Sequence, residues 1–522
     1  MTKFLLRLRP VDTSQWLFVG FVGLLLAGGA LAGLRQQPAL ALPALGVLGV
    51  GLLLLRWQWL YYILFLTLPF SHEIGLPGGL SLDVPSEPLM VLLLGCVPLA
   101  LLLGPGSWRQ LTRREWRHPL LVLPVLLLAW AALDICFSVN QTRSFKYVLA
   151  KCWYLVPFLL GSLLLVRRPA DFWRLAACYV VATVVSLAWT LPRHASTGFS
   201  FAQTNWAIQP FYRNHVIYAT VLALLLPLAW GLARQAPTPL RRRLWWAASG
   251  VLFFGLITSY TRASWLSLPV AGIFYGAMRL RLTRVLLVGV GLSVAGAAAY
   301  FVSGDNFMRF APNYEKTIWH GGNLAAHLES TYTLEDVSGM ERVYRWVAAA
   351  RMIADKPLVG SGPATFYPEY KRYTVSSFRT YVSQNFEQST AHNYFLLTLA
   401  EQGVPGFLLF CALVATAMLT AERLYHASAG QPEVRRVVLA VSLSLVIILF
   451  HLFLNELVEV DKIGSVFFVT LAMLIRSETW LARLPEPSEP ALNAASLARR
   501  AANRAVGTPA RPLPTPAPSP VT

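Results

Sequence analysis

Charged side chains are scarce in this chain. Asp, Glu, Lys and Arg make up 13% of its 522 residues, whereas 56% of the residues are hydrophobic. That balance excludes an ordinary soluble protein. Long uncharged runs take the place of the missing charges, such as residues 17–34, 88–104, 119–137, 153–166, 244–257, 285–302, 406–420 and 437–454. Because about 20 apolar residues cross a bilayer as a helix, the sequence predicts an all-α polytopic membrane protein.

Cysteine is also rare, and none of the five cysteines forms a C-x-x-C pair. They lie within or beside apolar runs, at Cys96, Cys136, Cys152, Cys178 and Cys411. A buried free cysteine behaves as a small hydrophobic residue. We therefore expect neither disulfides nor thiolate metal ligands.

Motifs for nucleotide and metal chemistry are missing. The chain has no G-x-x-x-x-G-K-[ST] loop, no H-E-x-x-H and no D-x-D. The sequence therefore predicts neither a nucleotide cofactor nor a metal site. Glu335 and Asp336 form an adjacent acidic pair in a long polar segment, and a solvated face explains this pair more simply than a cation site.

Basic residues outnumber acidic ones, and the net charge is +19. In a soluble protein this excess would suggest nucleic acid, but here the Arg residues gather in alternate loops, at 106–118, 232–244 and 420–437. Lys and Arg collect in cytoplasmic loops of membrane proteins, so we expect no nucleic-acid partner. The intervening segments then face outward, at 71–87, 138–147, 192–213, 258–264, 304–391 and 455–461.

This alternation predicts about 14 crossings with both termini inside. The segments 39–55 and 57–70 are short, and without them the number is about 12. The chain then divides into four parts: N-terminal transmembrane helices at 1–303, a large outer loop at 304–391, C-terminal transmembrane helices at 392–480, and a tail at 481–522. The tail is rich in Pro, Ala and Arg, and we expect it to be disordered in the cytoplasm.

The outer loop 304–391 is long enough to carry its own structure. Residues 338–357 are predicted to form an amphipathic helix that ends at Pro357, and a Gly-Pro turn follows at 357–366. On that helix Arg342 and Arg345 are three residues apart, so both lie on one face. Two Arg side chains on one face suit a phosphate, although ion pairs with Glu341 or Asp336 would also explain them.

Arg262 lies in a short outer hairpin between two apolar runs. A charge so close to the bilayer is costly unless it is paired or hydrated, and outward loops are poor in Arg. We therefore favour a functional role for Arg262 over an arginine that only reaches to lipid headgroups.

Weaker candidates open other helices at the same outer surface. Arg213 and His215 precede one apolar run, and Arg143 and Lys146 precede another. Polar residues are common at such positions, so we favour an ordinary polar helix start over a functional role for each pair.

His392 stands where the polar loop gives way to a long apolar helix, and Asn393 follows it. An imidazole with an ordinary pKa near 6.5 can accept a proton at neutral pH. The positive end of the helix dipole also disfavours the imidazolium. On these grounds His392 is either a catalytic base or a structural, hydrogen-bonded histidine.

Two motifs resemble the signatures of bacterial O-antigen ligases. One is His392-Asn393 followed by Gly403 and Gly406, and the other is Arg-x-x-x-Leu, which stands here at residues 262–266. Residues 342–366 also look like the loop of the wider ligase and polymerase superfamily. The resemblance covers about residues 205–455, and the N-terminal half resembles the family in hydropathy alone.

This resemblance implies an activity at the periplasmic face of the bacterial inner membrane, in a family that usually has about 12 helices. The donor would be O-antigen on undecaprenyl pyrophosphate, and the acceptor a sugar hydroxyl of the lipid A–core oligosaccharide. His392, Arg262 and Arg342 would be catalytic, without nucleotide or metal. The residues that would bind pyrophosphate or glycan are Arg345, Arg213, His215, Asn393, Arg143 and Lys146.

Three rival functions remain open. An O-antigen polymerase would use the same donor with another lipid-linked glycan as acceptor. A protein O-oligosaccharyltransferase of the same superfamily would glycosylate Ser or Thr, but such relatives often carry a further C-terminal extramembrane region. A transporter of lipid-linked sugars would favour polar groups at the membrane midplane, whereas the candidates here lie at its outer boundary.

Overall fold

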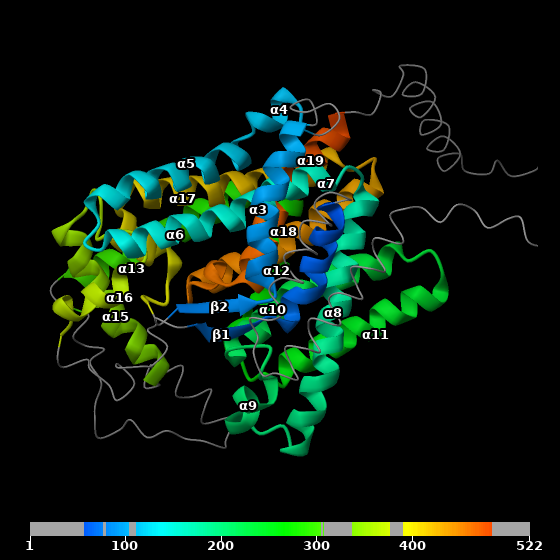
Figure 1. The fold of residues 1–522 in the computed structure, drawn as a ribbon, viewed down its shortest axis with the longest axis horizontal. Coiled ribbons are helices and arrows are strands. Elements are labelled where there is room, and N and C mark those ends of the chain that lie inside the picture. Colours follow the sequence, from blue (N-terminus) through cyan, green and yellow to red (C-terminus); the bar gives the residue numbers. More distant parts are fainter. Residues whose placement is uncertain are drawn as a thin grey trace, which may run out of the picture.

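The computed structural model describes residues 57–76, 80–103, 111–303, 306, 337–375 and 390–482. The predicted crossings at 17–34 and 39–55, the pair Glu335 and Asp336 and the tail beyond residue 482 lie outside these residues. Within them the chain is a multi-pass membrane protein built almost wholly from helices (Figure 1).

Eight of the described helical segments are long and apolar enough to cross a membrane. They are Pro119–Phe137 (α5 with a short extension), Gln141–Leu165 (α6 to α7), Pro169–Ser196 (α8), His215–Gln235 (α10), Thr283–Phe301 (within α13, Thr283–Val302), Tyr394–Ala427 (α17), Pro432–Leu452 (α18) and Asp461–Ala482 (α19). Four other helices occupy predicted crossings but are shorter or less apolar: residues 57–67, α3 (Ser86–Leu103), α11 (Pro239–Ile257) and α12 (Arg262–Arg279).

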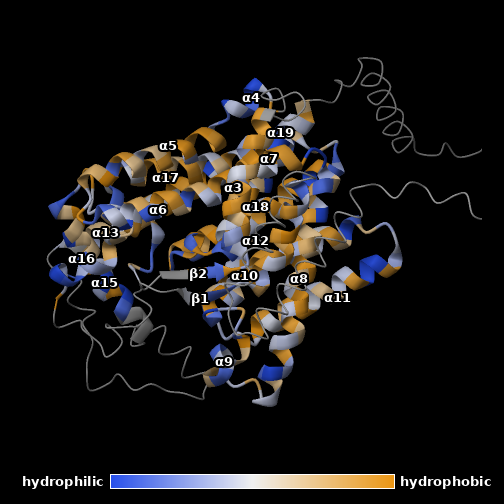
Figure 2. Cartoon of the chain, in the orientation of Figure 1, coloured by the Kyte–Doolittle hydropathy of each residue, from blue (hydrophilic) through white to orange (hydrophobic). Residues whose placement is uncertain are grey.

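Helices α10, α18 and α19 form the centre of the bundle, where most of their residues are buried. Helices α5, α6 and α17 run side by side along one edge (Figure 1). Figure 2 shows α5 and α17 as mainly hydrophobic and α6 as mixed, whereas α4 (Arg113–Trp116) and one end of α11 are hydrophilic. The apolar lengths thus lie between polar helix ends, as a bilayer requires.

The helices alternate between two faces of the molecule. On the face that we call the basic face, α5, α8, α11 and α18 each begin with proline, a residue suited to the first helical turn. On the opposite face, which we call the His392 face, α6, α10 and α17 begin after the capping residues Asn140, Asn214 and Asn393. Each Asn side chain accepts a backbone N–H of the first turn.

One small sheet was not expected from the sequence. Strands β1 (His72–Leu76) and β2 (Leu80–Val84) pair antiparallel, with Glu73 opposite Asp83. Ser86 joins this hairpin to the start of α19, because its hydroxyl bonds both Ser71 at 2.5 Å and the carboxylate of Asp461.

The predicted outer segment 138–147 is also more helical than expected. Helix α6 (Gln141–Tyr154) begins at residue 141, because the side chain of Asn140 accepts the N–H of Arg143 at 3.1 Å. The helix predicted at 338–357 is confirmed as α15 (Val337–Asp355). It is followed by α16 (Phe366–Tyr370), and both lie at the left-hand end of the molecule in Figure 1.

Candidate active site

His392 lies directly before the cap of helix α17. Its φ of 51° is in the left-handed region, which residues other than glycine seldom adopt. Neighbouring contacts hold it there: the carbonyl oxygen of Thr390 accepts Nη1 of Arg345 at 2.9 Å, and that of Ala391 accepts Nε1 of Trp346 at 3.0 Å. Helix α15 thus fixes the two residues before His392 from the side.

Polar and charged side chains from two segments, α15 and residues 455–456, act on the His392 ring. The imidazole shares a hydrogen bond with the side chain of Asn455, and Glu456, Arg342 and Arg345 act on it electrostatically. Burial, which is the largest effect, and the two arginines lower the pKa of His392, whereas Glu456 and Asn455 raise it. The net shift is downward, so the ring is neutral and able to accept a proton at neutral pH.

The two arginines of α15 both act on His392, which their spacing on one helix face did not predict, and they do so from different settings. Arg345 is only 1% exposed, pairs with Glu341 at 3.2 Å and lies over the ring of Tyr370 at 5.5 Å. These contacts let the enclosed Arg345 guanidinium support the loop, and its phosphate-binding role stays a prediction. Arg342 is half-buried and is the one better placed to meet a substrate.

A glycine-rich turn closes the site against helix α17. The buried carboxylate of Glu401 accepts the N–H of Ala364 at 2.9 Å and that of Phe366 at 2.8 Å. Gly403 has a φ of 64°, and a Cβ there would lie 2.1 Å from the carbonyl oxygen of Leu358. Gly403 therefore kinks α17 to admit the turn.

Gly406 lets α17 pack closely against a neighbouring helix. A Cβ on this residue would lie 3.3 Å from the side chain of Trp130 on α5. The indole of Trp130 also donates to the carbonyl oxygen of Gln402 at 2.9 Å. Helix α17 is thus held against α5 directly below the kink.

Several polar residues near His392 were missed by sequence reasoning. The clearest are Asn455 and Glu456, which follow the end of α18, and the ion pair between Lys151 and Glu459 at 2.7 Å. Nζ of Lys151 lies 5.9 Å from the ring of Tyr394, two residues after His392. The available signal was the segment 455–461, which is rich in acids although it lies between two apolar runs.

A small apolar hollow of about 60 Å³ lies beneath this ion pair. Tyr147, Lys151 and Tyr394 line its polar end, and residues of α5, α17 and α19 such as Leu128, Leu413 and Phe467 line the rest. The hollow joins the charged site to the apolar body of the bundle.

Arg262 is linked to the same region through helix α18. It is the first residue of α12, and two residues later the hydroxyl of Ser264 bonds Nε2 of His451 at 2.9 Å. The carbonyl oxygen of His451 then accepts the N–H of Asn455 at 2.7 Å. Helix α12, which begins at Arg262, thus contacts the segment 451–456 through Ser264, and His392 reaches the same segment through Asn455.

Arg213 and His215 belong to the neighbourhood of Arg262. The carbonyl oxygen of His215 accepts Oγ1 of Thr261 at 3.3 Å, and Nδ1 of His215 lies 3.2 Å from Oδ1 of Asn205. Arg213 is exposed and lies 3.7 Å from Glu73 on strand β1. These contacts place both residues on the His392 face without bringing them to the His392 ring.

Arg143, Lys146 and Asn393 lie at helix starts on the same face. Arg143 and Lys146 are exposed on α6, while Ser144 between them is buried and donates to the carbonyl oxygen of Pro363 at 2.8 Å. Oδ1 of Asn393 accepts the N–H of Leu396 at 3.0 Å, so part of its hydrogen-bonding capacity is used in the cap.

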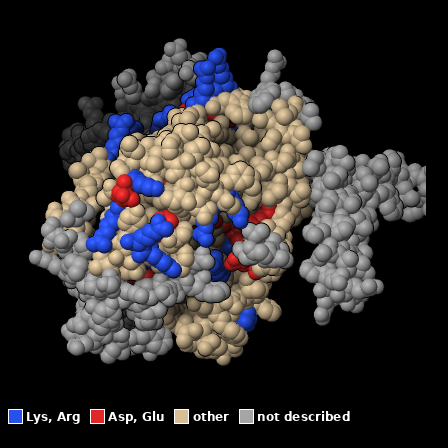
Figure 3. All heavy atoms as spheres, turned by 60° about the vertical axis from the view of Figure 1, so that its left-hand side comes forward, with Lys and Arg blue, Asp and Glu red and all other residues tan. Residues whose placement is uncertain are grey.

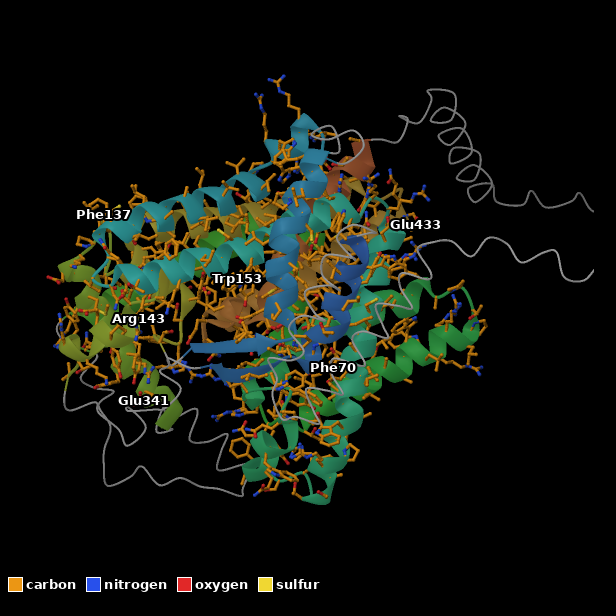
Figure 4. All side chains as sticks on the ribbon, in the orientation of Figure 1. Phe70, Phe137, Arg143, Trp153, Glu341 and Glu433 are labelled. Atoms are coloured by element: carbon orange, nitrogen blue, oxygen red, sulfur yellow. The ribbon has the colours of Figure 1, made fainter. Side chains whose placement is uncertain are left out.

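Charged residues gather at this end of the bundle, some exposed, such as Arg143, and some buried, such as Glu341. Figure 4 shows Arg143 and Glu341 at the end formed by α6 and α15, far from Glu433 at the other end. Figure 3 turns this end toward the reader, and lysine and arginine side chains gather there with acidic side chains among them. Such a mixed surface suits an anionic, heavily hydroxylated ligand better than an apolar one.

Comparison with known proteins agrees with this geometry. Residues 247–411 match a family model described as O-antigen ligase, and no curated protein matches the chain. The matched segment contains Arg262, Arg342, Arg345 and His392. The chain therefore carries an O-antigen ligase family domain on a multi-pass, all-α membrane scaffold.

Proposed function

We propose that this protein is an inverting glycosyltransferase that transfers O-antigen polysaccharide from undecaprenyl pyrophosphate to a sugar hydroxyl of lipid A–core, giving lipopolysaccharide. The observation that carries this proposal is the position of His392, a neutral imidazole held at a helix start beside Glu456 and Arg342. The family match over residues 247–411 supports ligase or polymerase chemistry of this kind.

In this mechanism His392 is the general base. Its ring nitrogen takes the proton from the acceptor hydroxyl, and the hydroxyl oxygen forms the new bond to the anomeric carbon. Glu456 then stabilises the imidazolium, because it favours the charged ring. Proton transfer of this kind typically contributes about 10²–10⁴-fold to the rate.

The bond from the anomeric carbon to the pyrophosphate oxygen breaks in the same step, and undecaprenyl pyrophosphate leaves. A single displacement inverts the anomeric configuration. Arg342 and Arg262 stabilise the charge that develops on the leaving group, and Arg345 positions the loop that holds His392. The remaining candidates, Arg213, His215, Asn393, Arg143 and Lys146, are proposed to contact the pyrophosphate or the glycans.

The location of the site follows from the charge asymmetry of the loops. The basic face carries the Arg-rich segments, so it lies in the cytoplasm and the His392 face lies in the periplasm. We accordingly propose that the protein lies in the inner membrane, where the donor lipid would present its glycan outward. The donor brings its own leaving group, so the reaction needs neither nucleotide nor metal.

A reconstituted transfer assay tests this proposal. The purified protein is supplied with an undecaprenyl-pyrophosphate glycan, with and without lipid A–core, in the presence of a chelator and without nucleotide. Wild type should shift the acceptor on a gel, His392→Ala should lose at least about 10²-fold of the rate, and Arg351→Gln should match wild type. Arg351 is the control because it is exposed on the same helix, α15.

The other outcomes of the assay discriminate the rivals. Donor chains that lengthen without lipid A–core would make the protein a polymerase, and glycan on an acceptor peptide would make it a protein O-oligosaccharyltransferase. Movement of the lipid-linked glycan from one leaflet to the other, with no new glycosidic bond formed, would make it a transporter. Full transfer by folded His392→Ala would remove the base role from His392.

A further inference from the structure

A second hollow lies on the basic face, at the opposite end of the bundle from His392. It has a volume of about 430 Å³ and opens between the end of α10 and the start of α18. Its lining residues are Pro227, Trp230, Gly231, Arg234, Arg436, Leu439 and Ala440. The volume falls within the usual range for a small-molecule site.

Two arginines supply all the charge in this lining. Arg234 is near the end of α10 and lies over the ring of Trp230 at 5.4 Å, while Arg436 lies in the second turn of α18. Among the described residues, neither guanidinium has a carboxylate within ion-pairing distance. Glu433 is exposed one turn before Arg436 and forms no ion pair with it.

Two helix dipoles of opposite sign meet at this hollow, because α10 ends there and α18 begins there, so the net positive charge comes from the two arginines. Arg436 stands near the N-terminus of α18, and Arg234 stands near the C-terminus of α10. A phosphate placed between the guanidinium groups would accept hydrogen bonds from both. The charge at the rim therefore selects for an anion.

The walls of the hollow select for an apolar body below that anion. Pro227 and Ala440 are buried, and Leu439 and Trp230 are half-buried. These residues belong to α10 and α18, two helices that are long and apolar enough to cross a membrane, near the ends that lie on the basic face. A free phosphate ion would leave these walls unused, whereas a phospholipid would use both parts.

We propose that this hollow binds an anionic phospholipid of the adjacent leaflet, with its phosphate between Arg234 and Arg436 and its chains along Trp230 and Leu439. The sequence predicts this leaflet to be the cytoplasmic one. Basic pockets between transmembrane helices on that side are suited to anionic headgroups. The site is separate from the proposed glycosyl transfer and does not depend on it.

Thermal unfolding in lipid nanodiscs tests this site. The full chain is placed in phosphatidylcholine nanodiscs, and phosphatidylglycerol is added in steps. The unfolding temperature of wild type should rise with phosphatidylglycerol. The double variant Arg234→Gln/Arg436→Gln should bind phosphatidylglycerol with an apparent affinity about tenfold weaker or more. Arg241→Gln with Arg243→Gln is the matched control, because these arginines are exposed on the same face but do not line the hollow.

The control decides between a site and a diffuse charge effect. Equal weakening by both double variants would overturn the proposal, since it would mean that only the total charge of the face matters. A rise of the same size with inorganic phosphate in pure phosphatidylcholine would also overturn it. If the first double variant fails to fold, Arg234→Lys with Arg436→Lys keeps the charge, and native mass spectrometry should show fewer retained phosphatidylglycerol molecules than for wild type.

Discussion

Two buried ionic clusters lie at opposite faces of the same bundle, and each contains a histidine whose pKa is lowered by burial. On the basic face, Nε2 of His118 lies 2.8 Å from Glu478, and Nδ1 accepts the N–H of Leu120 at 3.1 Å. His118 has an ordinary extended backbone, whereas His392 has a φ of 51°. Both ring nitrogens of His118 are therefore used in structural contacts, one with α19 and one with the first turn of α5.

The comparison teaches that a shifted pKa does not by itself mark a catalytic residue. The basic-face cluster joins α4, α17 and α19, because Glu478 pairs with Arg114 at 2.6 Å and Arg423 at 3.0 Å. Around His392 the charges of Arg342 and Glu456 oppose each other beside a strained backbone. Strain kept at such a position is typical of a functional site.

The largest expected effect is on stability, at the basic face. Glu115 is 1% exposed, forms an ion pair with Arg476 and accepts the hydroxyl of Thr479 at 2.9 Å. Glu115→Gln leaves the Arg476 charge buried, and should lower the free energy of unfolding by about 3–5 kcal/mol. Chemical unfolding in detergent measures this.

The control for that variant is Arg174→Gln. Arg174 pairs with Asp171 at 3.2 Å, but its side chain is 70% exposed. Removing an exposed pair should cost less than about 1 kcal/mol. Similar losses in the two variants would show that burial does not distinguish these ion pairs, and the structural view of the basic-face cluster would fail.

The second prediction concerns catalysis on the His392 face. Arg342→Gln removes a cation from the proposed leaving-group site and should lower kcat/KM by about 10²–10³-fold, as expected for loss of one charge-stabilising donor. The unfolding temperature should change little, since Arg342 is half-buried. Arg351→Gln, on the same helix, should leave kcat/KM unchanged; a loss there equal to that of Arg342→Gln would contradict the assignment.

Much of this arrangement could be predicted from local sequence. The apolar runs predict the helices, the spacing of Arg342 and Arg345 predicts their common face, and the polar-to-apolar change at His392 predicts a helix start. These features depend on residues close in the chain. Arg342, Arg345 and His392 also lie in the motifs that resemble the O-antigen ligase family.

The contacts between distant segments could not be predicted in this way. Glu456 is 64 residues from His392 along the chain, and no local pattern shows that α18 ends beside α17. Likewise the burial of Arg345 depends on Tyr370 and the carbonyl of Thr390, which meet only when the outer loop folds. Single-sequence periodicity defines faces of helices but not which faces meet.

The third prediction concerns the turn beside the kink of α17. In Gly403→Ala the new Cβ would clash with the carbonyl of Leu358, at 2.1 Å, and the backbone would keep a φ of 64°. We expect a cost of about 1–3 kcal/mol in stability and a loss of transfer activity, because the displaced turn carries residues 358–366. Gly430→Ala, where nothing lies within 4 Å of the added Cβ, should be neutral in both measurements.

The smallest expected effect is a shift of the pH profile. Transfer needs the neutral ring, so kcat/KM should fall as the pH drops through the lowered pKa of His392, below its ordinary 6.5. Glu456 raises this pKa and Arg342 lowers it. Glu456→Gln should therefore move the acid limb to lower pH, and Arg342→Gln should move its residual activity to higher pH, each by about one pH unit or less.

The opposite signs make this pair of variants a sharp test, since a general loss of structure would move both limbs the same way. Folding stability provides an independent readout. A lowered pKa in the folded state means that His392 contributes stability above pH 6.5 that is lost as the pH falls through the folded-state pKa. In His392→Ala this part of the acid sensitivity should disappear, whereas in His118→Ala the His392 contribution should remain; if both variants retain the full acid sensitivity, the neutral imidazole assigned to His392 is wrong.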